Sequence, residues 1–152
     1  MRKFLLIFLL ALTSFAVAAT EPDPAQAQAK RLLQQAQPSI DWHAASSLRI
    51  DIDDDGRPDY VFLAVVKERA NIGVVLGANN RVIYHFYDWT CGGGWSLEPY
   101  NPDSDPAIPV GSPVPGFEVS KTAHSFALAP GDCDAYNFFW NRQKNDIDLW
   151  RL

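Results

Sequence analysis

Five aspartates are crowded into the nine residues from Asp51 to Asp59, DIDDDGRPD. Counted from Asp51, carboxylates stand at positions one, three, five and nine, and Gly56 at position six allows the chain to turn tightly. Side chains at alternate positions of such a turn can converge on one centre, and Ca²⁺ takes about six to eight oxygen ligands. The candidate ligands are the side chains of Asp51, Asp53, Asp55 and Asp59 and the backbone carbonyl of Arg57.

The alternative for this stretch is a charged turn that binds no ion. Carboxylates packed this densely repel one another when no cation is present, which favours the metal site. A bound Ca²⁺ would have a structural role, because it would hold together the two strands expected on either side. Its dissociation constant would lie in the weak extracellular range of roughly 10⁻⁴ to 10⁻³ M.

The acidic stretch and the apolar run after it, YVFLAV, resemble the calcium loops of FG-GAP and VCBS repeats, which occur in integrin-type β-propellers and secreted bacterial proteins. Position twelve is Phe62, in an expected strand, where an EF-hand requires a bidentate glutamate on a helix. The resemblance implies that Asp59 is the late carboxylate ligand and that Asp54 faces solvent. It is limited to about Asp51 to Val66 and occurs once, so it implies a strand-loop-strand unit and no propeller.

The rest of the chain predicts a mainly β fold with one short N-terminal helix. Helix-forming residues with apolar positions at helical spacing run from Ala25 to Gln37, before Pro38. We expect about eight antiparallel strands in a meander, sandwich-like or open-barrel arrangement, the first four being consecutive neighbours. The expected strands are Arg49 to Ile52, Tyr60 to Val66, Asn71 to Leu76, Arg81 to Tyr87, Phe117 to Ser120, His124 to Leu128, Tyr136 to Asn141, and Asp146 to Leu152.

The N-terminus is typical of a secretory signal peptide. Arg2 and Lys3 precede an apolar run from Phe4 to Leu12, and small residues before Thr20 offer a cleavage site. The apolar run is about half the length of a membrane-spanning helix. The expected organisation is a signal peptide over residues 1–19, a linker and helix over 20–38, and one β-rich domain over 39–152. Cleavage would remove two basic side chains and change the net charge from −5 to −7, which disfavours nucleic acid as a partner.

Cys91 and Cys133 are the two cysteines of the chain, and in an oxidising compartment they most simply form a disulfide. The alternative is a nucleophilic Cys91 served by His85 or His124. Cys91 lies in a segment rich in glycine and proline from Asp88 to Pro115, in which we expect a long loop and no strand.

Three aromatic residues of this segment, Trp89, Trp95 and Tyr100, could form a binding loop. Large amphipathic rings exposed on a tethered loop are common at interfaces with proteins and sugars. The alternative is a loop folded over the sheet with the same rings turned inward.

Common catalytic motifs are absent from the sequence, which contains no Gly-x-Ser-x-Gly, no His-Glu-x-x-His and no phosphate-binding glycine loop. We therefore expect a periplasmic or secreted binding or inhibitor-like module without catalytic activity, whose partner is a protein or glycan of the cell envelope. One alternative is a cell-envelope hydrolase that uses Asp132, Asp134 or His124, with Asp103 or Asp105 as a second carboxylate. Another alternative is an immunity protein for a secreted toxin.

Overall fold

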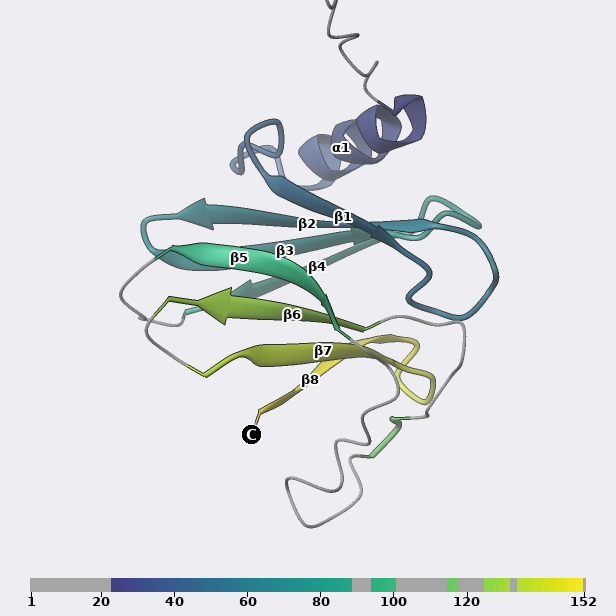
Figure 1. Ribbon diagram of the computed structural model, residues 1–152. Coiled ribbons are helices and arrows are strands. Elements are labelled where there is room, and N and C mark those ends of the chain that lie inside the picture. Colours follow the sequence, from purple (N-terminus) through teal and green to yellow (C-terminus); the bar gives the residue numbers. More distant parts are fainter. Residues whose placement is uncertain (1–22, 89–93, 101–114, 118–124, 132–133, 152) are drawn as a thin grey trace, which may run out of the picture.

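A computed structural model describes residues 23–88, 94–100, 115–117, 125–131 and 134–151. These residues form one helix and eight strands, arranged as two four-stranded antiparallel sheets without a closed barrel (Figure 1). The predicted mainly β fold with a short N-terminal helix is therefore confirmed. Residues 1–19, which carry the expected signal peptide, lie outside the described part.

The helix α1 (Pro24–Ala36) covers one face of the first sheet (Figure 1). Asp23 caps its start by accepting a hydrogen bond from the Ala25 N–H at 3.0 Å, and Pro24 takes the first turn, where no N–H is needed. Leu33 is fully buried against the sheet beside Trp42 and Phe62. Gly73 makes this contact possible, because a Cβ there would lie 2.5 Å from Leu33 Cδ2. In the described part of the chain, no helix is long and apolar enough to cross a membrane.

The first sheet is the predicted meander. It has the strand order β1 (Ser46–Ile50), β2 (Asp59–Val66), β3 (Arg69–Val75) and β4 (Val82–Tyr87), each antiparallel to the next. Residues 77–80 lie in the hairpin turn that connects β3 to β4, and Asn80 has a positive φ of 58°, which asparagine tolerates in such turns. β2 lies between the helix and the second sheet, which explains its continuous apolar run.

The second sheet contains one strand that the sequence did not predict. Its order is β5 (Trp95–Tyr100), β6 (Ser125–Pro130), β7 (Tyr136–Asn141) and β8 (Asp146–Arg151). We expected no strand between Asp88 and Pro115, and this prediction is wrong, because β5 lies within that segment and includes Pro99. β5 is an edge strand, and an edge position tolerates a residue that cannot donate a ladder hydrogen bond. Of the strand expected at Phe117 to Ser120, Phe117 is not in a strand and the other residues lie outside the described part.

The main core fills the space between the two sheets. Phe126 of β6 stacks on Phe138 of β7 with ring centroids 4.8 Å apart, and Tyr87 of β4 meets Phe138 edge-on at 5.5 Å. At one side of the sandwich, β1 lies next to β5 (Figure 1). The loop after β1 is therefore placed at the margin of both sheets, where the acidic stretch is found.

Candidate metal centre

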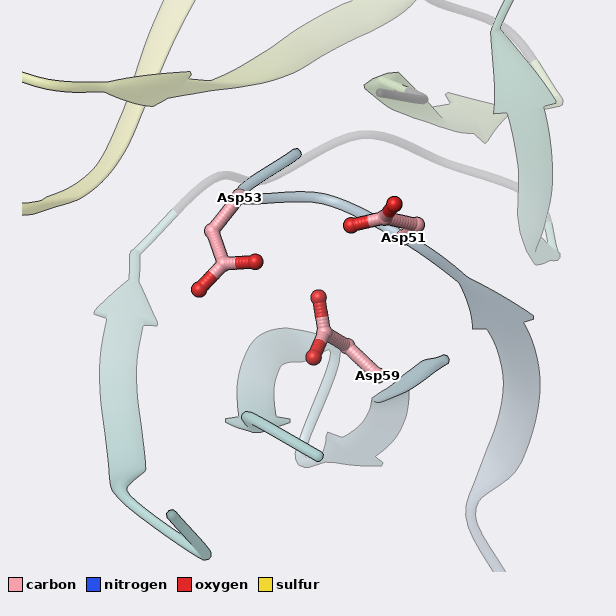
Figure 2. Close-up of side chains that lie close together, drawn as sticks. All are labelled: Asp51, Asp53 and Asp59. Atoms are coloured by element: carbon pink, nitrogen blue, oxygen red, sulfur yellow. The ribbon is translucent and has the colours of Figure 1, made fainter. Parts of the chain in front are cut away.

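The antiparallel pairing of β1 and β2 brings three of the predicted ligands together. Ile50 pairs with Asp59, so the residue after β1 and the first residue of β2 face each other across the base of the loop. Asp51, Asp53 and Asp59 each contribute a carboxylate oxygen to a group in which all these oxygens lie within 4.8 Å of one another. Figure 2 shows the three carboxylates turned toward a common centre. Oxygens at this spacing can bind one hard cation.

Asp59 is the most buried member of the group, with 0% of its surface exposed. Its Oδ2 accepts a hydrogen bond from the Ile52 N–H and its Oδ1 accepts one from the Gly77 N–H, both at 2.8 Å. Burial raises the pKa of Asp59 to about 6, although these two hydrogen bonds oppose the shift. Each carboxylate oxygen has a second lone pair, so both remain available to a cation.

Gly77 contributes a backbone N–H to the candidate site, and the spacing of the acidic residues does not point to it. A Cβ at this position would lie 2.2 Å from the backbone oxygen of Pro58, so only glycine allows the β3–β4 turn to approach the loop this closely. The approach is what lets the Gly77 N–H reach Asp59. Gly77 and Asp59 are 18 positions apart, so the spacing of the aspartates within the loop could not predict this contact.

Asp51 shapes the loop by binding its backbone. Its Oδ1 accepts a hydrogen bond from the Asp55 N–H at 3.2 Å, and its Oδ2 accepts one from the Gly56 N–H at 3.0 Å. Gly56 has a φ of 82°, as the predicted tight turn requires. An open groove of about 480 Å³ runs from Asp51 along β1 to Pro99 of β5, and Asp51 is the member of the group that lines it.

Asp53 is the least satisfied member of the group. Its Oδ1 is buried and has no hydrogen-bond partner among the described residues. Burial raises the pKa of Asp53, and the neighbouring charges of Asp55 and Asp51 raise it further. A buried carboxylate oxygen without a partner is costly unless a cation or proton binds it.

Asp55 and Asp54 lie outside the group. Asp55 is exposed, and its Oδ1 accepts a hydrogen bond from the Arg57 N–H at 2.8 Å, so the structure does not bring this predicted ligand to the other three. Asp54, which the resemblance placed facing solvent, instead pairs with Arg142 at 2.9 Å across the two sheets. The predicted role of the Arg57 carbonyl stays a prediction.

The proposed aromatic loop is replaced in part by a strand. Trp95 belongs to β5, is half-buried against the main core and stacks on Tyr136 with ring centroids 6.4 Å apart. Tyr100 ends the same strand and is also half-buried. The alternative with rings turned inward therefore describes Trp95. Trp89, Cys91 and Cys133 lie outside the described residues, and so does the predicted disulfide.

Two residues of the alternative catalytic sites, His85 and Asp134, lie in the described part of the chain. His85 Nε2 and Asp146 Oδ1 lie 3.0 Å apart, within hydrogen-bond distance, and this contact links β4 to β8. Asp134 is exposed, while Asp103, Asp105, His124 and Asp132 lie outside the described residues.

No family model, curated protein or solved structure matched the chain. The resemblance of the acidic loop to FG-GAP and VCBS repeats therefore stays a prediction that rests on the residues of the loop itself.

Proposed function

We propose that this protein is an exported, calcium-stabilised binding module, in which Asp51, Asp53 and Asp59 hold one structural Ca²⁺. The observation that carries the proposal is the convergence of the three carboxylates around a buried Asp53 oxygen that has no partner among the described residues. A cation at this centre would satisfy that oxygen and neutralise the repulsion within the group.

The chemistry of the donors favours a hard cation. All three side chains offer carboxylate oxygens, the ligands that Ca²⁺ and Mg²⁺ prefer over softer metals. Ca²⁺ tolerates irregular geometry, whereas Mg²⁺ demands a near-ideal octahedron. The loop holds Asp51 and Asp59 by backbone hydrogen bonds, and an open groove begins at Asp51. This arrangement suits the larger ion, which would take backbone carbonyls and water as its further ligands.

The proposed role of the cation is to stabilise the place where the ends of three strands, β1, β2 and β3, meet. Asp51 follows β1, Asp59 begins β2, and Asp59 also holds Gly77 in the turn after β3. A cation bound by both aspartates would therefore stabilise the first sheet at one end. Its contribution would be greatest in a compartment with millimolar calcium, such as the periplasm or the extracellular medium.

A binding or inhibitor-like role is supported by the acidic net charge and by the absence of common catalytic motifs from the sequence. The proposed partner is a protein or glycan of the cell envelope. Affinity capture from an envelope extract, in calcium and in chelator, would test this part. A component retained by the wild type in calcium and released by the chelator is expected; equal retention by an unrelated β-sandwich protein would contradict it.

Thermal unfolding in calcium and in chelator tests the cation site. At about 10 mM Ca²⁺ and a dissociation constant of roughly 10⁻⁴ to 10⁻³ M, mass action predicts stabilisation by about 1 to 3 kcal/mol and a rise in Tm of roughly 5 to 10 °C. Asp53→Asn should lose most of this rise. In chelator the same variant should be at least as stable as the wild type, because it removes a charge that burial disfavours.

Asp55→Asn is the matched control for Asp53→Asn. It removes a charge of the same loop, but Asp55 lies outside the group of three and binds the Arg57 N–H. We expect it to keep most of the calcium effect. A wild type whose Tm is the same in calcium and in chelator would contradict the proposed site, and so would an Asp53→Asn variant that responds to calcium like the wild type.

A further inference from the structure

A second hollow lies beside the acidic loop, between the first half of α1 and the end of the first sheet. It has a volume of about 230 Å³, and its walls are mainly apolar. Ala25 and Ala29 form the helix side, while Tyr60, Val75 and Leu76 form the sheet side. We call this hollow the helix–sheet pocket.

The pocket results from the small side chains in one row of the helix. Positions 25, 29 and 33 are four residues apart and therefore lie along one face of α1. Leu33 fills the space above the sheet at the third position, where Gly73 leaves room for it. At the first two positions alanine leaves this space open. The side chain of Tyr60 stays at the pocket because its hydroxyl donates a hydrogen bond to Asp23 Oδ2 at 2.7 Å.

The polar groups at the pocket are mainly hydrogen-bond donors. Arg57 lines it, is exposed, and has no ion-pair partner among the described residues. Asn80 adds an exposed amide, and Gln28 uses its Oε1 to accept a hydrogen bond from Arg31 at 2.7 Å. Among the described residues, no aspartate or glutamate lines the pocket. The arginine therefore favours a ligand with an anionic, acceptor-bearing end.

We propose that the helix–sheet pocket binds a small amphipathic carboxylate, with its apolar body between helix and sheet and its carboxylate on Arg57. The size of the pocket limits the apolar body to about one ring, since an apolar cavity of about 150 Å³ admits benzene. This inference does not rest on the proposed cation site. Arg57 is shared with the acidic loop, but the pocket would use its side chain, whereas the predicted metal ligand is its backbone carbonyl.

Titration with 3-phenylpropionate tests the proposal, followed by NMR shifts of the amides of Ala25, Leu76 and Gly77. The titration is run once with calcium and once with chelator, which keeps it distinct from the test of the cation site. We expect saturable shifts with a dissociation constant of roughly 1 mM, given the few atoms of the probe. The matched alcohol, 3-phenylpropan-1-ol, should bind about three- to five-fold more weakly, the range of one exposed ion pair.

Three variants locate the site. Ala25→Trp should fill the pocket and abolish saturable binding, whereas Ala27→Trp places the same ring on an exposed helix position outside the lining and should leave binding unchanged. Arg57→Gln should weaken binding of the acid by about three- to five-fold and leave binding of the alcohol unchanged. The proposal is overturned by an absence of saturable shifts in the wild type, by equal binding to wild type and Ala25→Trp, or by an acid that binds no better than the alcohol.

Discussion

Asp59 is a carboxylate held in a fully buried position by two backbone N–H groups. Without a cation, burial raises its pKa to about 6 from an ordinary value near 3.8. Because the folded state then holds a proton more tightly than the unfolded state, the stability from this group is present below pH 4 and is lost as the pH rises to about 6. The loss is about 2 to 3 kcal/mol.

The pKa of Asp59 can be measured directly from the ¹³C shift of its carboxyl group during a pH titration. In chelator we expect a midpoint near pH 6. In saturating calcium the midpoint should fall below 4, because the cation favours the charged carboxylate. A midpoint near 4 in both conditions would show that Asp59 is neither desolvated nor a ligand.

At the residue scale, the acidic spacing predicted more converging side chains than the structure brings together. Alternation and Gly56 indicated a shared centre for four aspartates, and three of them, Asp51, Asp53 and Asp59, gather around one point. The same alternation included Asp55, which instead accepts a hydrogen bond from the Arg57 N–H two residues later. Such a local contact competes with ligation and depends on the detailed backbone of the turn, which spacing alone does not determine.

At the scale of elements, Gly77 links the β3–β4 turn to the acidic loop. In Gly77→Ala, the new Cβ would lie 2.2 Å from the Pro58 oxygen, so the turn must move away and the hydrogen bond to Asp59 must lengthen or break. We expect a loss of about 1 to 3 kcal/mol in chelator, measured by urea unfolding, together with weaker calcium binding.

Gly94→Ala is the control for Gly77→Ala. Gly94 is exposed, and a Cβ there would meet nothing within 4 Å, so the same substitution should change the free energy of unfolding by about 0.5 kcal/mol or less. Equal effects of the two substitutions would contradict the role given to the contact between Gly77 and the loop.

The elements themselves were predictable to different degrees. The strands of the first sheet follow from apolar runs, and the sequence predicted them within a few residues. β5 was missed because Pro99 argues against a strand when its position in the sheet is unknown. Whether a strand lies at an edge is decided by long-range pairing, here with β6, which local composition does not show.

At the scale of the whole molecule, the aromatic core between the sheets should dominate stability. Phe138 is fully buried and contacts Phe126 and Tyr87, one from its own sheet and one from the other. Phe138→Ala should lower the free energy of unfolding by about 3 to 5 kcal/mol, because it removes these contacts and leaves a cavity.

Phe86→Ala provides a matched comparison for Phe138→Ala. Phe86 is 48% exposed on β4, with the guanidinium of Arg69 over its ring at 5.7 Å. Its loss should cost about 1 kcal/mol or less. Similar costs for the two substitutions in urea unfolding would contradict the packing of the two sheets around Phe138.

From the sequence, the way the two sheets pack could be predicted only as a fold class, either sandwich-like or an open barrel. Sequence periodicity indicates which faces of a strand are buried but not which sheet covers them. The contacts that join the sheets, such as Asp54 with Arg142 and His85 with Asp146, connect residues 88 and 61 positions apart. Spacing within the motif therefore indicated which carboxylates could share a centre, whereas the position of the group at the margin of both sheets required the structure.

A crystal structure grown in calcium is the most direct test of the cation site. We predict one anomalous difference peak between β1 and β2, coordinated by oxygens of Asp51, Asp53 and Asp59 at about 2.3 to 2.6 Å. The buried Asp53 Oδ1 should be among the ligands. Three carboxylates in the same places with no ion between them, in crystals soaked with saturating calcium, would contradict the site.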